Sequence, residues 1–155
     1  MDTQQGNVPN KKASRSHRVW RKSEEDALMK CMVAEISDKW SADNGFKLGF
    51  FTLLEKEMAK IMPESNIKAS PHINSKVKYW RRTYAKICDI VGLSGFGWDH
   101  VNKRIDVDDD VWKIYEEANP KKVKEVGGKR FPYFDDWEII FGKDRANGCG
   151  AEAPA

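Results

Sequence analysis

The sequence has little of what exported, membrane and metal-binding proteins depend on. No apolar run approaches the roughly 20 residues of a membrane span, and the basic N-terminal segment leads into Trp20 and acidic residues rather than an apolar signal-peptide core. The three cysteines, Cys31, Cys88 and Cys149, are far apart and form no zinc-finger pattern with the three histidines. We therefore predict an intracellular protein in a reducing compartment, with Cys31 and Cys88 in the core and no metal or cofactor.

The sequence also lacks the motifs of a catalytic site. His17, His72 and His100 have no cysteine or carboxylate at metal-ligand spacing, and no Ser, Cys or Lys lies in a recognised nucleophile motif. The acidic run DVDDD at 106–110 fits either a divalent ion or the start of a helix, and its position before an amphipathic segment favours the helix. We predict that the protein is not an enzyme.

What the chain does have is aromatic residues and unevenly distributed charge. Its 155 residues suffice for one domain, and six Trp, seven Phe and four Tyr can form a core although 33% of the residues are charged. Residues 10–22 and 68–86 each carry six Lys or Arg and no acidic residue, whereas residues 24–64 hold nine Asp or Glu against five Lys. Positive charge is therefore concentrated in two segments.

The apolar spacing predicts an all-α fold. Leu28, Met32, Ile36 and Trp40 recur every four residues after a helix-start signal at Ser23, which predicts a first helix. A second helix is predicted over 50–61, ending before a proline, and a third over 71–91, starting at Ser-Pro and ending in a left-handed glycine at 92. A short β-hairpin around 100–103 and a fourth helix after 108–110 complete the prediction.

The third helix is strongly amphipathic. At 100° per residue its apolar residues fall in one band, and the band comprises Ile73, Val77, Trp80, Tyr84, Ile87, Cys88 and Val91. The opposite side holds only basic or neutral donors: Ser75, Lys78, Arg82 and Lys86. Asn74 and Arg81 lie on one flank and Lys76 on the other. The apolar band predicts attachment to the core, and the basic face predicts an exposed surface without acidic residues.

Such a face fits double-stranded DNA. The major groove admits one α-helix, whose Lys and Arg reach phosphates and guanine edges and whose Asn reads adenine. We predict base and nearby phosphate contacts from the first half of the helix, and a phosphate contact from its second half. These residues are Asn74, Ser75, Lys76, Lys78, Arg81, Arg82 and Lys86.

The N-terminal basic segment is a second candidate for DNA contact. We predict a disordered arm over residues 1–18 that follows the DNA backbone or lies in the minor groove. Its candidate residues, with those just after it, are Arg15, Arg18, Arg21 and Lys22. The same segment is equally typical of a nuclear import signal.

Six blocks of the sequence resemble a known family. They are RVWRKSEEDALMKCM, WSADNGFKLGFF, PHINSKVKYWRRTY, SGFGWD, DDDVW and FPYFDDWEIIFGKDRANG, in this order between about residues 18 and 148. In this order and spacing they resemble the plant Myb/SANT-like family, which includes the Myb-like partners of Harbinger-type transposases. Trp20, Phe50 or Phe51, and Trp80 resemble the three regularly spaced Trp of ordinary Myb repeats, although the spacing is wider.

The resemblance implies a nuclear DNA-binding protein of the transcription-regulator or transposase-accessory type. It implies a three-helix helix-turn-helix domain over 19–92 whose third helix binds DNA. We expect the hairpin and fourth helix over 93–119, a linker over 120–131, a short aromatic helix over 132–142, and a disordered tail over 143–155.

A protein-interaction adaptor is the alternative. SANT-type domains also bind histone tails or partner proteins, and the aromatic, acidic segment FPYFDDWEIIFG is typical of a docking surface. A transposase-like or chromatin partner would then bind within 93–142. A reader of basic histone tails needs acidic residues on its third helix, whereas this helix has none before Asp89.

Removal of residues 1–18 tests the role of the arm. If the arm neutralises phosphates, the truncated protein should show a weaker dependence of duplex affinity on salt concentration, because fewer counterions are released on binding. The check is the slope of log affinity against log salt, and an unaltered slope would show that the arm is not on DNA.

Overall fold

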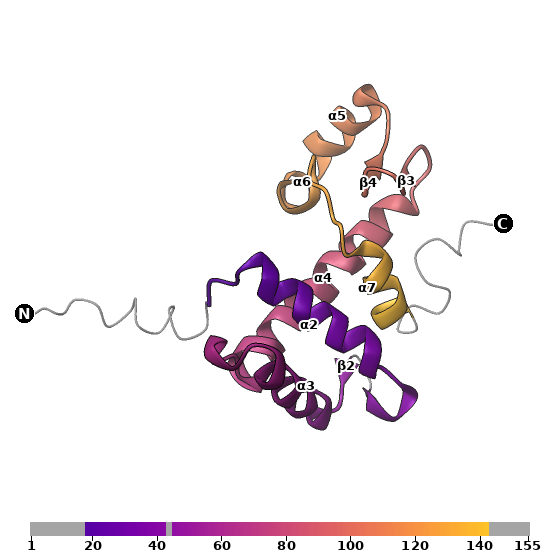
Figure 1. Cartoon of the computed structure of the whole chain (residues 1–155). Coiled ribbons are helices and arrows are strands. Elements are labelled where there is room, and N and C mark those ends of the chain that lie inside the picture. Colours follow the sequence, from indigo (N-terminus) through magenta and orange to yellow (C-terminus); the bar gives the residue numbers. More distant parts are fainter. Residues whose placement is uncertain (1–17, 43–44, 143–155) are drawn as a thin grey trace, which may run out of the picture. The chain divides into compact units, whose positions relative to one another are not determined.

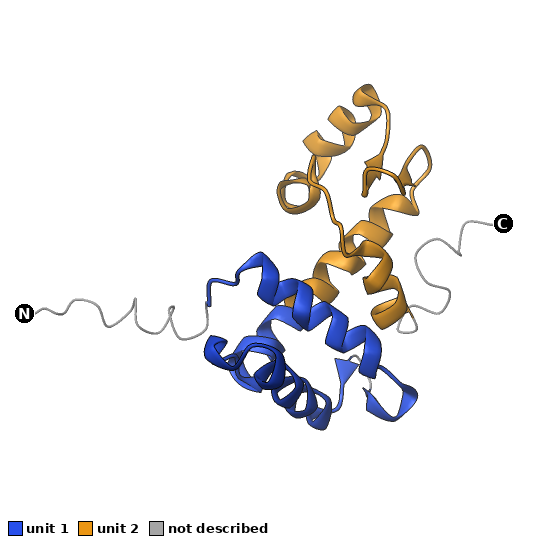
Figure 2. Ribbon diagram, in the orientation of Figure 1, with its two compact units in different colours: residues 1–78 blue, residues 79–155 orange. Residues whose placement is uncertain are grey.

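The computed structural model describes residues 18–42 and 45–142, and the chain divides into two compact units, residues 1–78 and 79–155 (Figure 2). The described residues form six α-helices, α2 to α7, several short helical turns and two small two-stranded sheets (Figure 1). The predicted helical architecture is confirmed, with strands confined to the two small sheets among the described residues. The predicted arm and tail lie almost wholly outside the described residues.

Helix α2 (Lys22–Glu35) begins the first unit and starts two residues earlier than predicted. Arg21, not Ser23, is the residue before the helix, and the Glu24 carboxylate accepts a hydrogen bond from the Arg21 backbone N–H at 2.9 Å. Leu28 and Met32 are fully buried, so the first half of the predicted apolar stripe forms. The helix ends at Glu35 because Ile36 is extended.

Trp40 is therefore not part of the first helix, and this part of the prediction is wrong. It lies in a separate 3-10 turn, η2 (Asp38–Trp40), which precedes the small sheet of β1 (Ser41–Ala42) and β2 (Gly45–Phe46). The centre of the Phe50 ring lies 5.7 Å from the centre of the Trp40 ring and 4.9 Å from the centre of the Phe46 ring. Ile36 and Trp40 continue the four-residue spacing in sequence only, because the chain is extended at Ile36 and Trp40 belongs to a separate turn.

Helix α3 (Leu48–Ile61) packs against α2 within the first unit. Its residues Phe50, Leu54 and Met58 have no exposed surface, and their spacing of four residues places them on one side of the helix. Pro63 begins the short turn η3 (Pro63–Ser65), and the helix ends before it as predicted. Helix α3 thus fixes the core of this unit.

Helix α4 (Asn74–Val91) follows a kinked helical turn, η4 (Ala69–Ile73). Ser70 is extended inside that turn, so the regular helix starts at Asn74, three residues later than predicted. At the other end Gly92 donates its N–H to the Cys88 carbonyl at 3.0 Å. The predicted left-handed glycine at 92 is wrong, because the glycines with positive φ among the described residues are Gly95 and Gly128.

The two faces of α4 lie as the periodicity predicts. The apolar band is buried, with 5% or less of each residue exposed for Ile73, Val77, Trp80, Tyr84, Ile87 and Cys88, while Val91 is half-buried. Ser75, Lys78 and Arg82, on the opposite side, are exposed. Cys31 and Cys88 are both buried in the core, as predicted. Cys31 is free, whereas Cys88 is disulfide-bonded, which differs from the prediction of a reducing compartment.

In the second unit, β3 (Gly97–Asp99) pairs with β4 (Arg104–Asp106) in an antiparallel hairpin. The Asp99 carboxylate accepts hydrogen bonds from the backbone N–H groups of Val101 and Asn102 at 2.9 and 3.0 Å, and these bonds lower its pKa. The hairpin predicted around residues 100–103 is confirmed. Helix α5 (Asp109–Ala118) is the predicted fourth helix, but it begins within the acidic run, two residues earlier than predicted, so that Asp109 and Asp110 lie in its first turn.

Residues 120–131 are not simply a linker, because α6 (Pro120–Val126) lies within them. Pro120 occupies the first turn, and Val123 and Val126 are buried. Gly127 follows the last residue of the helix. A side chain does not fit there, because a Cβ atom on residue 127 would lie 2.7 Å from the Trp112 ring and 2.8 Å from the Val123 carbonyl oxygen. The prediction overlooked a short helix whose stability comes from packing rather than from its length.

Helix α7 (Phe134–Phe141) confirms the predicted short aromatic helix. Phe134 stacks on Trp98 with ring centres 4.1 Å apart, and its ring centre lies 5.6 Å from that of Tyr84. Phe141 lies 5.9 Å from Tyr84 on the same measure. The aromatic residues of α4, β3 and α7 therefore form the core of the second unit. No helix among the described residues is long and apolar enough to span a membrane.

Replacement of Trp80 by Ala should destabilise the protein severely. The side chain is 3% exposed, and truncating a buried Trp costs about 3–5 kcal/mol, a large part of the stability of a small domain. The neighbouring Tyr79, which is 47% exposed, is the control, and Tyr79→Ala should have a much smaller effect. Urea denaturation of both variants checks this, and equal losses would mean that Trp80 does not anchor the helix.

Candidate nucleic-acid interface

The exposed face of α4 combines Ser75, Lys78 and Arg82. Lys78 and Arg82 are four residues apart and so lie on the same side, one turn from each other. No carboxylate among residues 18–42 and 45–142 forms an ion pair with either of them. The Arg82 guanidinium lies 5.9 Å from the centre of the Tyr79 ring. The two cations are thus positioned by the helix backbone, and neither is held in an ion pair among the described residues.

Lys76 serves a different purpose in the structure. Its ammonium group lies 2.9 Å from the Glu25 carboxylate of α2 and 5.4 Å from the centre of the Trp20 ring. The Lys76 side chain is only 15% exposed. This cation therefore ties the start of α4 to α2 within the first unit and is not part of the open basic face.

The flanking residues are only partly accessible. Asn74 and Arg81 are half-buried. The Arg81 guanidinium lies 4.9 Å from the centre of the Phe141 ring, and burial lowers its pKa from the usual arginine value. Lys86 is half-buried and forms an ion pair with Glu125 of α6. Of the predicted α4 residues, the structure therefore brings three together as an exposed group and packs the other four more closely.

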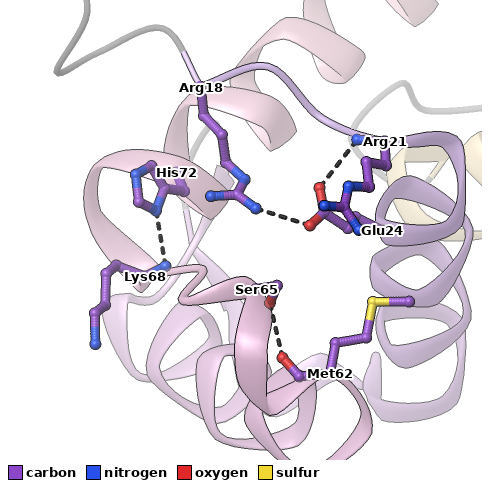
Figure 3. A network of polar contacts seen from close by, with 7 residues as sticks. All are labelled: Arg18, Arg21, Glu24, Met62, Ser65, Lys68 and His72. Carbon is purple, nitrogen blue, oxygen red and sulfur yellow. Dashed lines mark hydrogen bonds and ion pairs between the residues drawn. The ribbon is translucent and has the colours of Figure 1, made fainter.

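The basic residues at and just before the start of α2 also differ: some form ion pairs, and others are exposed. Arg18 pairs with Glu24 at 2.8 Å, and Glu24 is 4% exposed (Figure 3). The Arg18 guanidinium lies 5.6 Å from the Trp20 ring centre. Lys22 pairs with Asp26 at 2.8 Å on the surface, and Arg21 is exposed. Arg15 lies outside the described residues.

A hollow of about 640 Å³ lies beside these residues in the first unit. Arg18, Arg21 and Glu24 line one side of it, and Met62 and Ser65 line the other (Figure 3). Its polar contacts are internal, since the Ser65 hydroxyl donates to the Met62 carbonyl oxygen at 2.8 Å. Besides the ion-paired Arg18 and Glu24, the charged residues that line the hollow are Arg21 and Glu64, so it carries no excess of positive charge.

His72, near the start of α4, contributes no positive charge at neutral pH. Its Nδ1 atom accepts a hydrogen bond from the Lys68 backbone N–H at 2.9 Å, which requires an unprotonated nitrogen (Figure 3). Partial burial, and then the charges of Arg18 and Lys68, lower the pKa of His72. The positive potential of this region therefore comes from Lys and Arg alone.

The third long helix, α4, is thus buried on one side and basic on the other, and this arrangement can be compared with known proteins. A family model described as a Myb/SANT-like DNA-binding domain matches residues 19–115. The chain belongs to the Myb/SANT-like family. The matched residues include α2, α3 and α4, so the family assignment covers the exposed basic face. A role in DNA binding follows from this assignment, and the family is a DNA-binding class rather than an enzyme class.

One relative of this Myb/SANT-like chain is an uncharacterized protein of Arabidopsis thaliana, At2g29880. It is 26% identical over 151 residues, which cover 96% of the chain and 48% of the relative. The chain thus spans about half the length of that protein. No solved structure matches the chain significantly. Among the described residues, no group of three or more His, Cys, Asp or Glu is arranged to hold a metal ion.

Sequence reasoning missed one group of cations next to this interface. Lys121, Lys122 and Lys124 were assigned to a linker, but they lie on α6 and are exposed. The available signal was Asn119-Pro120 followed by valines three residues apart, which is a helix start with a short apolar face.

Arg18→Ala should lower stability, whereas Arg21→Ala should not. Loss of Arg18 leaves the buried Glu24 carboxylate without its ion-pair partner, which should cost about 1–3 kcal/mol. Arg21 is exposed and contributes its backbone N–H, which alanine retains. Thermal unfolding followed by circular dichroism compares the two variants. Equal midpoints would contradict a structural role for Arg18.

The same ion pair refines the truncation test. Deleting residue 18 along with the arm would remove the partner of Glu24 and so change stability together with charge. The truncation should therefore stop after residue 17.

Proposed function

We propose that the chain binds double-stranded DNA in the nucleus and that α4 reads the major groove. The observation that carries the proposal is the exposed pair Lys78 and Arg82, which stands opposite the buried Trp80 and has no carboxylate partner among the described residues. A basic face free of acidic residues avoids repulsion by the phosphate backbone. The family assignment over 19–115 supports DNA as the ligand.

The dimensions of α4 suit this role. Its 18 residues correspond to a length of about 27 Å, and the major groove is about 12 Å wide and accepts one helix. Arg82 and Lys78 are chemically suited to guanine edges or phosphates, and Ser75 to either base edges or phosphates. Asn74 is suited to adenine, and its position at the start of α4 would place it at the end of the contact.

The cations that form ion pairs differ in what they would contribute to DNA binding. Arg18 and Lys76 hold the first unit together through buried or half-buried carboxylates, so their contribution to DNA binding is indirect. Lys22 and Lys86 pair with exposed carboxylates, and a phosphate is a suitable replacement for such a partner. Arg21 is exposed and suits a phosphate contact.

The protein-interaction alternative has its own supporting observation in the second unit. A hollow of about 310 Å³ is lined by Trp98, Phe134 and the 53% exposed Ile139, with Asp135 and Glu138 also in its wall. This chemistry suits a partner segment that carries an aliphatic or aromatic side chain next to Lys or Arg. A transposase-like or chromatin partner bound here would be compatible with DNA binding by α4.

Lys78→Ala combined with Arg82→Ala should weaken duplex binding without changing the melting temperature. Loss of two exposed contacts should cost about 2–4 kcal/mol, or roughly thirtyfold to a thousandfold in affinity. Fluorescence anisotropy with labelled duplex measures this. Lys30→Ala with Lys56→Ala, two exposed lysines of α2 and α3, is the control for net charge. Unchanged binding by the folded α4 variant would refute the proposed function.

Selection of sites from a random duplex pool, repeated at two salt concentrations, tests whether the binding is specific. A motif that is enriched at both concentrations would support base reading by α4. Retention of DNA without enrichment would leave only electrostatic attachment and would contradict sequence-specific recognition.

A further inference from the structure

Helix α6 presents a second basic surface in the unit that contains most of α4. Val123 and Val126 are buried at 7% and 1% exposure, so this short helix has one inward side. At 100° per residue, Lys121 and Lys124 lie on the side opposite the valines, together with Glu125. Both lysines are exposed.

Two further cations continue this surface beyond the end of α6. Lys129 and Arg130 follow Gly127 and Gly128, and both are exposed. None of the ion pairs found among the described residues involves these two residues or Lys121 and Lys124. We call Lys121, Lys124, Lys129 and Arg130 the α6 surface.

Glu125 connects the α6 surface to the basic face of α4. Its carboxylate accepts a hydrogen bond from the Lys86 ammonium group. The charges of Arg82 and Lys129 also act on it, and together with Lys86 they lower its pKa. Lys86 and Arg82 of α4 and Lys129 of the α6 surface therefore lie near one exposed carboxylate within the second unit.

The α6 surface is fixed to the hairpin and to α5 rather than suspended on a linker. Before α6, the Asn119 amide donates to the Tyr115 carbonyl oxygen at 3.1 Å. After α6, Gly127 packs against Trp112, and the Phe131 N–H donates to the Lys103 carbonyl oxygen at 2.7 Å. Anchoring on both sides means that the lysines are presented at defined positions.

We propose that the α6 surface binds the phosphate backbone of the same duplex that α4 reads, and that Glu125 holds Lys86 until a phosphate replaces it. This inference rests on the proposed function of α4. The matched family region ends at residue 115, so the α6 surface lies outside it. Phosphate is the ligand indicated because the surface offers four exposed cations, and backbone phosphates receive the largest share of the contacts that proteins make to DNA.

The triple variant Lys121→Gln, Lys124→Gln and Lys129→Gln tests the surface in the full chain. If each lysine neutralises about one phosphate, the slope of log affinity against log salt should fall by about 3, and affinity should fall similarly for every duplex sequence. The matched control replaces three exposed lysines of the first unit, Lys30, Lys47 and Lys56, by Gln. Equal slopes for the two triple variants would overturn the proposal.

Glu125→Gln provides a test in the opposite direction. It releases Lys86 and removes a negative charge from the surface, so duplex binding should become roughly threefold to tenfold tighter at low salt. Glu116→Gln removes the same charge from an exposed position on α5 and is the control. Tightening of both variants to the same degree would indicate net charge alone and would contradict the role of Glu125.

The outcomes separate this inference from the proposed function. If Lys78→Ala with Arg82→Ala weakens binding and the α6 variants do not, α4 binds DNA and only the inference fails. If the α4 variant binds normally, the proposed function fails whatever the α6 variants do. Weakened binding of the triple variant to anionic-lipid vesicles, with duplex binding unchanged, would assign the surface to a membrane and overturn the proposal.

Discussion

Burial of one side of α4 is the constraint on which the rest of the structure depends. Trp80 and Tyr84 are 3% and 1% exposed, and they commit the apolar side of the helix to the core. Since a helix advances 100° per residue, this commitment also determines which residues face outward. Lys78 and Arg82 are exposed for that reason and not because of their charge. The stability of the core and the position of the basic face are therefore two results of the same packing, which links the fold directly to the proposed DNA contact.

The Lys and Arg residues of the chain differ in how readily a phosphate can replace their carboxylate partners, and the net charge of +3 does not show this difference. Glu24, the partner of Arg18, has a side chain only 5% exposed, whereas Glu125, the partner of Lys86, has one that is 48% exposed. Removing a cation from a buried carboxylate leaves a charge that water cannot reach, and this is costly. Removing one from an exposed carboxylate costs little because water and salt replace it. A DNA phosphate can therefore compete for Lys86 but not for Arg18.

The parts of the fold that were predictable from sequence are those set by local periodicity. The inward side of α4, the hairpin at 100–103 and the aromatic α7 each depend on residues close together in the chain. The contacts that could not be predicted join distant residues: Lys76 and Glu25 are 51 positions apart, and nothing in the local pattern of either indicates the other. Helix α6 was overlooked because seven residues carry too little propensity to show a helix, and its two buried valines gain their stability only from the folded unit. The candidate site was thus predictable as a face, but its division into open and paired cations was not.

If α4 reads bases and α6 contacts phosphates, the affinity for DNA and the preference for a base sequence can change separately. Base edges specify a sequence, whereas phosphate contacts set position and strength without reading it. Helix α4 carries side chains suited to both tasks, whereas the lysines of α6 are proposed to serve only the second. Because Glu125 lies among cations of both elements, a single carboxylate can set how much of the combined charge is available to a phosphate. A change there would alter the strength of binding while leaving Ser75, Lys78 and the buried side of α4 as they are. The proposed interface therefore separates the residues that would choose a site from those that would hold it.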